Sequence, residues 1–245
     1  MAECCLKGFR WDADPKGHET TLAGRSCYVT GSNDTVAIMI IHDLFGWTFR
    51  NTRLLADHYA EEVNATVYIP DFFGGEVISV EILSDPSQFQ KLDIPSFTNR
   101  NSKAIREPEI FDCARALRST YQRLGAIGFC YGGWGVFRLG AKGSQLVDCI
   151  STAHPTNLTK EEIQNIGVPV QILAPELDPM FTEELKAFSN QTIPTLGVAY
   201  DYQFFPGLEH AFAIRGDSRK PSERDGMERA KNAAVLWFRQ WLQVQ

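Results

Sequence analysis

Short apolar runs typical of strands alternate with longer amphipathic segments along most of this chain. The strand candidates are residues 26–30, 36–41, 66–70, 124–129, 148–153, 168–174 and 200–205. The helical candidates are residues 50–62, 108–123, 132–140, 182–190 and 222–244. Strands that alternate with helices favour a mostly parallel sheet with helices packed on both faces. The pattern therefore predicts an α/β fold with a central sheet of about seven to eight strands.

Nothing in the composition divides the 245 residues into two parts, so we expect residues 1–245 to form a single domain. The segment 76–105 departs from the regular alternation. It mixes prolines, serines, asparagines and apolar residues without a sustained period. Long connections of this kind in compact domains are usually functional or mobile. We predict that this segment forms a cap, or lid, over a site.

Charge and cysteine usage limit the possible partners and compartments. A formal net charge of −6 without a basic cluster argues against nucleic-acid binding. No apolar run approaches the length of a membrane span, and the first residues lack the apolar core of a secretory signal. Without a secretory signal, the six scattered cysteines are expected to be reduced thiols. The adjacent Cys4 and Cys5 are interpreted as structural or incidental. We expect a cytoplasmic protein that binds neither nucleic acid nor membranes.

The sequence GFCYGG at 128–133 joins a strand candidate to a helix candidate. A cysteine between glycines at such a turn has the arrangement of a nucleophile elbow. The sharp turn strains the backbone of the central residue, and the glycines remove side chains that would clash with it. The following helix end stabilises a thiolate and offers an N–H group to an oxyanion. We predict that Cys130 is a nucleophile; the alternative is a buried structural cysteine.

A nucleophilic thiol needs a base and a group that orients the base. His210 stands in a loop after the last strand candidate and before the last helix, where an α/β-hydrolase places its histidine. Asp178 is the predicted orienting acid, with Glu176 as the alternative, although an aspartate there could instead cap a helix. The order nucleophile, acid, histidine is that of α/β-hydrolases and differs from the orders in chymotrypsin-like and subtilisin-like proteases.

With these motifs the chain resembles the dienelactone hydrolase family (carboxymethylenebutenolidase-like proteins) over nearly its whole length, and most of all its fungal branch. The matching segments are IIHDLFGW, ADHYAEE, VYIPDFFGG, GFCYGG, ILAPELD and FPGLEHAFAIRG. The resemblance implies an α/β-hydrolase fold and a triad of Cys130, His210 and Asp178. It implies cleavage of small-molecule esters or enol-lactones without metal or organic cofactor. We expect a thioester acyl-enzyme as the intermediate, and a monomer or homodimer.

The same resemblance assigns roles to residues near the triad. Asp43 would control the resting thiol, and the N–H groups of Leu44 and Tyr131 would form the oxyanion hole. The bacterial pattern has a glutamate at the position of Asp43, which could instead be a turn or helix-capping aspartate. The bacterial pattern also places a carboxylate-binding arginine four residues after the histidine, whereas Arg215 follows at five. The alternative for Arg215 is an ion pair with a surface acid such as Asp217.

The fungal resemblance suggests larger lactones or polyketide-like esters as substrates. Side chains beside the motifs are pocket candidates, although large aromatic residues are more often core: Trp47, Phe72, Phe73, Tyr131 and Trp134, together with His154. A thioesterase, an isomerase or cyclase using the same site, and a non-catalytic ligand-binding relative remain alternatives. A glutamine-amidotransferase-like protein is a weaker one, because that class places a glutamate two residues after the histidine, where this chain has Phe212.

Overall fold

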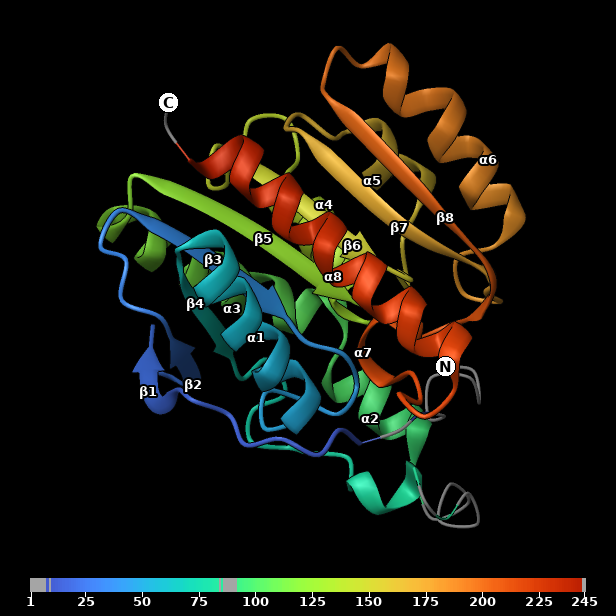
Figure 1. Cartoon of the computed structure of the whole chain (residues 1–245). Coiled ribbons are helices and arrows are strands. Elements are labelled where there is room, and N and C mark those ends of the chain that lie inside the picture. Colours follow the sequence, from blue (N-terminus) through green and yellow to red (C-terminus); the bar gives the residue numbers. More distant parts are fainter. Residues whose placement is uncertain (1–7, 9, 84, 86–91, 244–245) are drawn as a thin grey trace.

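The computed structural model describes residues 8, 10–83, 85 and 92–243. Cys4 and Cys5 lie outside the described residues, as does part of the predicted cap segment. The described residues form an eight-stranded sheet of order β1-β2-β4-β3-β5-β6-β7-β8, with helices on both faces (Figure 1). The predicted α/β-hydrolase architecture is therefore confirmed.

The strands from β3 to β8 are parallel, and β1 and β2 add an antiparallel edge. The strands are β1 (His18–Leu22), β2 (Arg25–Thr30), β3 (Val36–Ile41), β4 (Thr66–Pro70), β5 (Arg123–Phe129), β6 (Cys149–Ala153), β7 (Val170–Leu177) and β8 (Tyr200–Glu209). The helices are α1 (Arg50–Val63), α2 (Ile94–Arg100), α3 (Lys103–Thr120), α4 (Gly132–Leu139), α5 (Lys160–Gln164), α6 (Glu183–Thr192), α7 (Phe212–Arg215) and α8 (Pro221–Leu242), with 3-10 turns η2 (Val80–Leu83) and η4 (Ile193–Thr195).

Strand β3 explains why the sheet is covered on both faces. Its six residues are all buried, because alternate side chains enter two different apolar layers. Met39 and Ile41 pack in the layer that contains α3 and α4, whereas Ile38 and Ile40 pack in the layer that contains α1 and α8. In Figure 1, α1 and α8 cross in front of the sheet and α3 and α4 lie behind it. Burial on both faces gives the continuous apolar run in the sequence.

Several elements differ from the sequence-based prediction, including the helices α2, α5 and α7, which were not expected. β1 was not expected, because its side chains are mostly exposed and carry no apolar signal. α3 begins at Lys103 rather than at Pro108, which lies inside the helix. β8 extends beyond the expected 200–205 through Pro206, a residue tolerated on an edge strand, and ends immediately before His210. The last difference places the predicted base directly at the carboxyl end of the sheet.

The described part of the segment 76–105 contains η2 and α2. Asp93 caps α2 by accepting the N–H of Ser96, and Phe97 packs edge-on against Phe73 with ring centroids 5.0 Å apart. Beyond the helix, the carbonyl of Asn101 accepts a 2.7 Å hydrogen bond from the hydroxyl of Tyr131, the residue after the predicted nucleophile. The segment is therefore anchored to the elbow, while its function as a lid stays a prediction.

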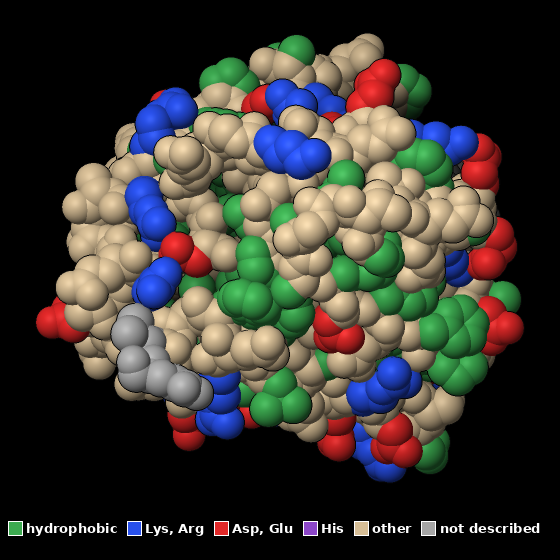
Figure 2. Space-filling model, turned by 90° about the horizontal axis from the view of Figure 1, so that it is seen from above, with side chains coloured by type: hydrophobic (Ala, Val, Ile, Leu, Met, Phe, Trp, Pro, Cys, Tyr) green, Lys and Arg blue, Asp and Glu red, His purple; other side chains and the backbone are tan. Residues whose placement is uncertain are grey.

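The end of the molecule seen from above in Figure 2 carries charged side chains of both signs around apolar side chains near its middle. No histidine side chain is visible on this face. Within the described residues, no helix combines the length and apolarity needed to cross a membrane.

Candidate active site

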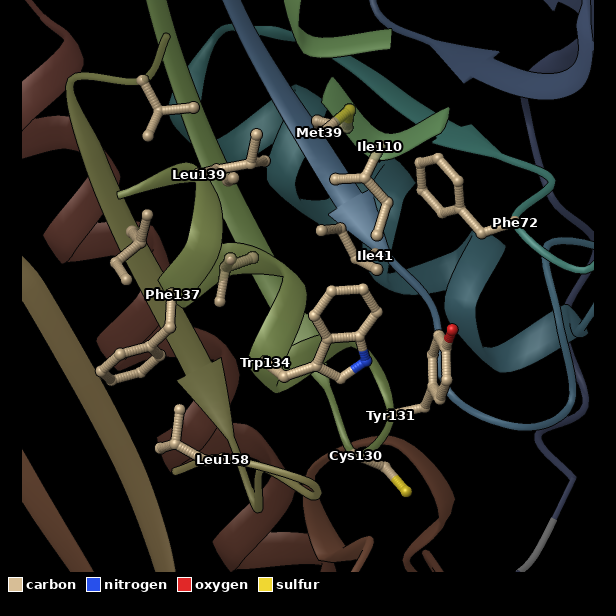
Figure 3. Packing of buried hydrophobic residues seen from close by; sticks show 14 of the residues in the cluster. Met39, Ile41, Phe72, Ile110, Cys130, Tyr131, Trp134, Phe137, Leu139 and Leu158 are labelled. Carbon is tan, nitrogen blue, oxygen red and sulfur yellow. The ribbon is translucent and has the colours of Figure 1, made fainter. Parts of the chain in front are cut away.

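The turn between β5 and α4 holds Cys130 in a left-handed conformation with φ of 49°. A side chain at Gly128 would overlap the backbone of Gly132, and one at Gly132 would overlap the backbone of Ile41 in β3. A side chain at Gly133 would likewise overlap Pro155. The three glycines are therefore required by the tight approach of the elbow to its neighbours. Figure 3 shows the Cys130 sulfur pointing away from the apolar cluster that α4 helps to form.

Backbone hydrogen bonds hold this strained residue in place. The N–H of Cys130 donates to the carbonyl of Ala153 at the end of β6, at 3.3 Å. The carbonyl of Cys130 accepts from the N–H groups of Gly133 and Thr156, at 3.0 and 2.8 Å. A strained backbone conformation at a non-glycine residue persists only when surrounding contacts hold it in place. Such residues cluster at functional sites.

Asp178 and His210 meet at the ends of β7 and β8. The imidazole Nδ1 lies 2.9 Å from each carboxylate oxygen of Asp178, and both side chains are fully buried. Oδ1 of Asp178 also accepts the N–H groups of Met180 and Phe181. Glu176, the alternative acid, instead accepts the N–H of Gly207 and is exposed. A carboxylate at Nδ1 places the proton there and leaves Nε2 as the basic nitrogen.

The ends of four neighbouring strands bring Cys130 and His210 to the same edge of the sheet. Phe129, which precedes the thiol, pairs with Ala153 in β6. The ring of the next residue, His154, lies 6.1 Å from the ring of Phe129 and 5.0 Å from that of His210, measured between centroids. The ring of His154 therefore lies between the strand that leads to Cys130 and the Asp178–His210 pair.

Asp43 and Arg215 form a buried ion pair beside this edge. Arg215 Nε lies 3.0 Å from Asp43 Oδ2, and both side chains are inaccessible to solvent. Oδ1 of Asp43 accepts the N–H of Phe45 at 3.0 Å, and the guanidinium carbon lies 5.0 Å from the Phe45 ring centroid. The predicted alternative, a surface pair of Arg215 with Asp217, is wrong, because Asp217 pairs with Arg219. Thiol control by Asp43 and substrate binding by Arg215 stay predictions.

The two predicted oxyanion donors, Leu44 and Tyr131, lie in adjacent turns. Ile41 at the end of β3 pairs with Gly128 at the end of β5, so the turn after each strand is near the other. Among the hydrogen bonds of the described residues, neither N–H group has an acceptor. Such unused backbone donors at an elbow are suited to binding a negatively charged oxygen.

The predicted pocket residues separate into two groups. Tyr131 packs edge-on against Trp134 and Phe73, with centroid distances of 5.7 and 5.0 Å, and Phe72 contacts the ring of His42. Trp47 instead packs in the apolar layer of α1 and α8 beneath Arg53. Phe73, Tyr131 and Trp134 therefore lie together at the elbow, whereas Trp47 belongs to the opposite layer.

His42 is a site-supporting residue that the sequence analysis did not single out. Its Nε2 accepts the N–H of Phe72, so the proton resides on Nδ1, which donates to the carbonyl of Asp43. Burial lowers the pKa of the His42 imidazole and favours this neutral form. The ring thereby ties the turn that carries Asp43 and Leu44 to the segment after β4. A histidine directly after a buried strand was the available signal.

A cavity of about 570 Å³ adjoins the histidine, with Leu208, His210, Phe212 and Arg215 in its lining. In the part of the chain that the structure describes, no three histidine, cysteine, aspartate or glutamate side chains lie together as a metal site.

Comparison with known proteins agrees with the observed fold. A model of the dienelactone hydrolase family matches residues 26–242. The hydrolase tropI of Talaromyces stipitatus is 30% identical, with 98% of this chain and 96% of the relative covered. The carboxymethylenebutenolidase homolog of Homo sapiens is 26% identical over 97% of this chain and 96% of its own length. The fold also matches the crystal structure of dienelactone hydrolase from Anabaena variabilis, with a TM-score of 0.61, 13% identity and coverage of 94% and 100%.

Proposed function

Because the chain belongs to the dienelactone hydrolase family, we propose that it hydrolyses small-molecule carboxylic esters or lactones with Cys130 as the nucleophile. The observation that supports this most is the buried Asp178–His210 pair at the same sheet edge as the strained Cys130 elbow. An elbow nucleophile and an oriented base at the same end of the sheet are the groups that acyl transfer requires.

In the first half of the proposed reaction, Nε2 of His210 takes the proton of the Cys130 thiol. The thiolate then attacks the ester carbonyl, and the N–H groups of Leu44 and Tyr131 stabilise the resulting oxyanion. Removing one such donor in a comparable site costs about 10²–10³ in kcat, so this contribution is large. Collapse of the intermediate expels the alcohol, which receives its proton from the His210 imidazolium, and leaves a thioester on Cys130.

In the second half, His210 takes a proton from water as the water attacks the thioester. The same two N–H groups stabilise the second oxyanion, and the acid product leaves with the thiol restored. Asp178 keeps the imidazole in the tautomer that both halves need and stabilises its charged form. Cys130 and His210 are both buried and expose only 1% and 5% of their surface.

Hydrolysis of p-nitrophenyl acetate by the wild-type chain and by Cys130→Ala tests the proposal. We expect a burst of p-nitrophenol from the wild type and a loss on the order of 10⁶ in kcat for the variant. Cys113→Ala is the matched control, because it removes a buried thiol of α3 that lies away from the elbow. Activity of Cys130→Ala within tenfold of the wild type would contradict the proposal.

Product analysis separates hydrolysis from the other reactions that the same site could support. Hydrolysis of a lactone adds the mass of one water, whereas an isomerase or cyclase product keeps the mass of its precursor. We expect the hydrated product when the protein is incubated with lactones and analysed by mass spectrometry.

A further inference from the structure

His154 is a fully buried polar residue that the proposed mechanism does not use. It follows β6 directly, and its N–H donates to the carbonyl of Leu173 at 3.1 Å. Its backbone is left-handed, with φ of 42°. Histidine adopts this conformation more readily than most residues, but strain at a non-glycine position still has to be compensated.

Aromatic rings surround the His154 imidazole. Besides Phe129 and His210, the ring of Phe212 lies edge-on at 5.8 Å between centroids. Neither ring nitrogen of His154 makes a hydrogen bond to another of the described residues. A buried polar group without a partner is costly, and in a native protein it needs an explanation. A site for a ligand is such an explanation, because the ligand supplies the missing partner.

The imidazole of His154 is held in its neutral form. Burial lowers its pKa well below the ordinary range, and positive charge on His210 and Arg215 lowers it further. A neutral imidazole has one N–H donor and one nitrogen acceptor. A hydroxyl group also donates and accepts, so it matches both functions of the ring.

A carboxylate fits the same place poorly, because it only accepts hydrogen bonds and needs a compensating positive charge. The cation beside the site is Arg215, whose Nε already lies 3.0 Å from the carboxylate of Asp43. The positive charge of Arg215 is therefore already compensated by Asp43 before any substrate binds.

From these observations we propose that His154 binds a hydroxyl group on the acyl part of the substrate. The site then selects neutral hydroxylated esters or lactones over carboxylated ones. This inference rests on the proposed hydrolysis at Cys130, and it adds the substrate class and the residue that recognises it.

Three p-nitrophenyl esters test the selection: butyrate, 3-hydroxybutyrate and the half-ester of glutarate. We expect the wild type to show at least tenfold higher kcat/KM for 3-hydroxybutyrate than for butyrate, the effect of one well-placed hydrogen bond in a buried site. The glutarate half-ester should be poorer than butyrate. Equal rates for butyrate and 3-hydroxybutyrate, or a preference for the carboxylated ester, would overturn the proposal.

Two variants separate substrate recognition from structural support. His154→Phe keeps an aromatic ring but loses both nitrogens, so the preference for the hydroxylated ester should fall to within about twofold. His154→Asn tolerates the left-handed backbone and keeps a donor and an acceptor, so part of the preference should remain. Far- and near-ultraviolet circular dichroism reports the folded fraction of each variant. Equal losses for both esters in both variants would mean that His154 supports the fold alone.

A binding measurement decides the question independently of hydrolysis. In Cys130→Ala protein with ¹⁵N-labelled histidine, methyl 3-hydroxybutyrate should shift the imidazole nitrogen signals of His154, and methyl butyrate should not. The His154→Asn variant identifies these signals. Unchanged signals with the hydroxylated ester would overturn the proposal, whereas failure of every ester to react in the wild type would refute only the proposed hydrolysis.

Discussion

Replacing Arg215 by methionine should destabilise the protein strongly. The substitution leaves Asp43 buried without its charge partner, and breaking a fully buried ion pair in this way costs about 3–5 kcal/mol. Loss of the guanidinium contact with the Phe45 ring adds roughly 0.5–1 kcal/mol. Because domains are stable by only about 5–15 kcal/mol, the change removes a large share of the total.

A double-mutant cycle measures how much of this destabilisation comes from the interaction between Asp43 and Arg215 itself. Asp43→Asn keeps an oxygen that can accept the N–H of Phe45 but removes the negative charge. The combined Asp43→Asn and Arg215→Met protein should therefore be less destabilised than the sum of the single variants, by roughly 1–3 kcal/mol. Urea unfolding at pH 7 provides the free energies of all four proteins.

Kinetics on two substrates test whether Arg215 binds a substrate carboxylate instead. If Arg215 is occupied by Asp43, Arg215→Met should lower kcat/KM equally for a carboxylated ester and for its methyl ester. A variant with unfolding free energy within about 1 kcal/mol of the wild type and a selective loss for the carboxylated ester would refute this reasoning. Arg215 would then bind the substrate carboxylate, as in the bacterial pattern.

Three further predictions concern the residues around the triad. Asp178→Asn should lower kcat about 10⁴-fold by favouring the wrong imidazole tautomer, and Glu176→Gln should have a much smaller effect; a reversed order in the steady-state rates would make Glu176 the orienting acid. Because the pKa of His154 is lowered in the folded protein, the unfolded chain takes up a proton on this histidine at a higher pH than the folded chain does. The free energy of unfolding should therefore fall as the pH drops below about 6.5, by up to ~1.4 kcal/mol per pH unit. His154→Asn should remove that part of the slope in urea unfolding between pH 7.5 and 5, and an unchanged slope would exclude His154 as its source. Gly132→Ala should prevent the elbow from closing on Ile41 and abolish activity, with lowered thermal stability; a fully active variant would show that the turn can relax.

The central strands and the positions of the candidate triad residues at the ends of strands could be predicted, because their signals are local. A strand buried on both faces gives a continuous apolar run such as residues 36–41, whichever distant segments pack against it. Glycines around a cysteine at the end of such a run report the tight turn directly. The order of Cys130, Asp178 and His210 then identifies the sheet edge where they meet.

The remaining features depend on contacts between distant parts of the chain. The pairing of Asp43 with Arg215 joins two turns far apart in sequence, and each residue alone had a reasonable local interpretation. Trp47 lies close to the first turn in sequence, but its side chain enters the layer of α1 and α8. The lack of a partner for His154 is likewise a property of the assembled interior, because a sequence does not show what surrounds a buried ring.

Rapid acid quench followed by peptide mass spectrometry identifies the nucleophile directly. Within seconds of mixing the wild-type protein with p-nitrophenyl acetate, we expect one acetyl group on the peptide that contains Cys130. The group should be released by hydroxylamine, as a thioester is, and it should be absent from Cys130→Ala. Acetylation confined to another residue while p-nitrophenol is produced at the full rate would contradict the assignment of Cys130 as the nucleophile.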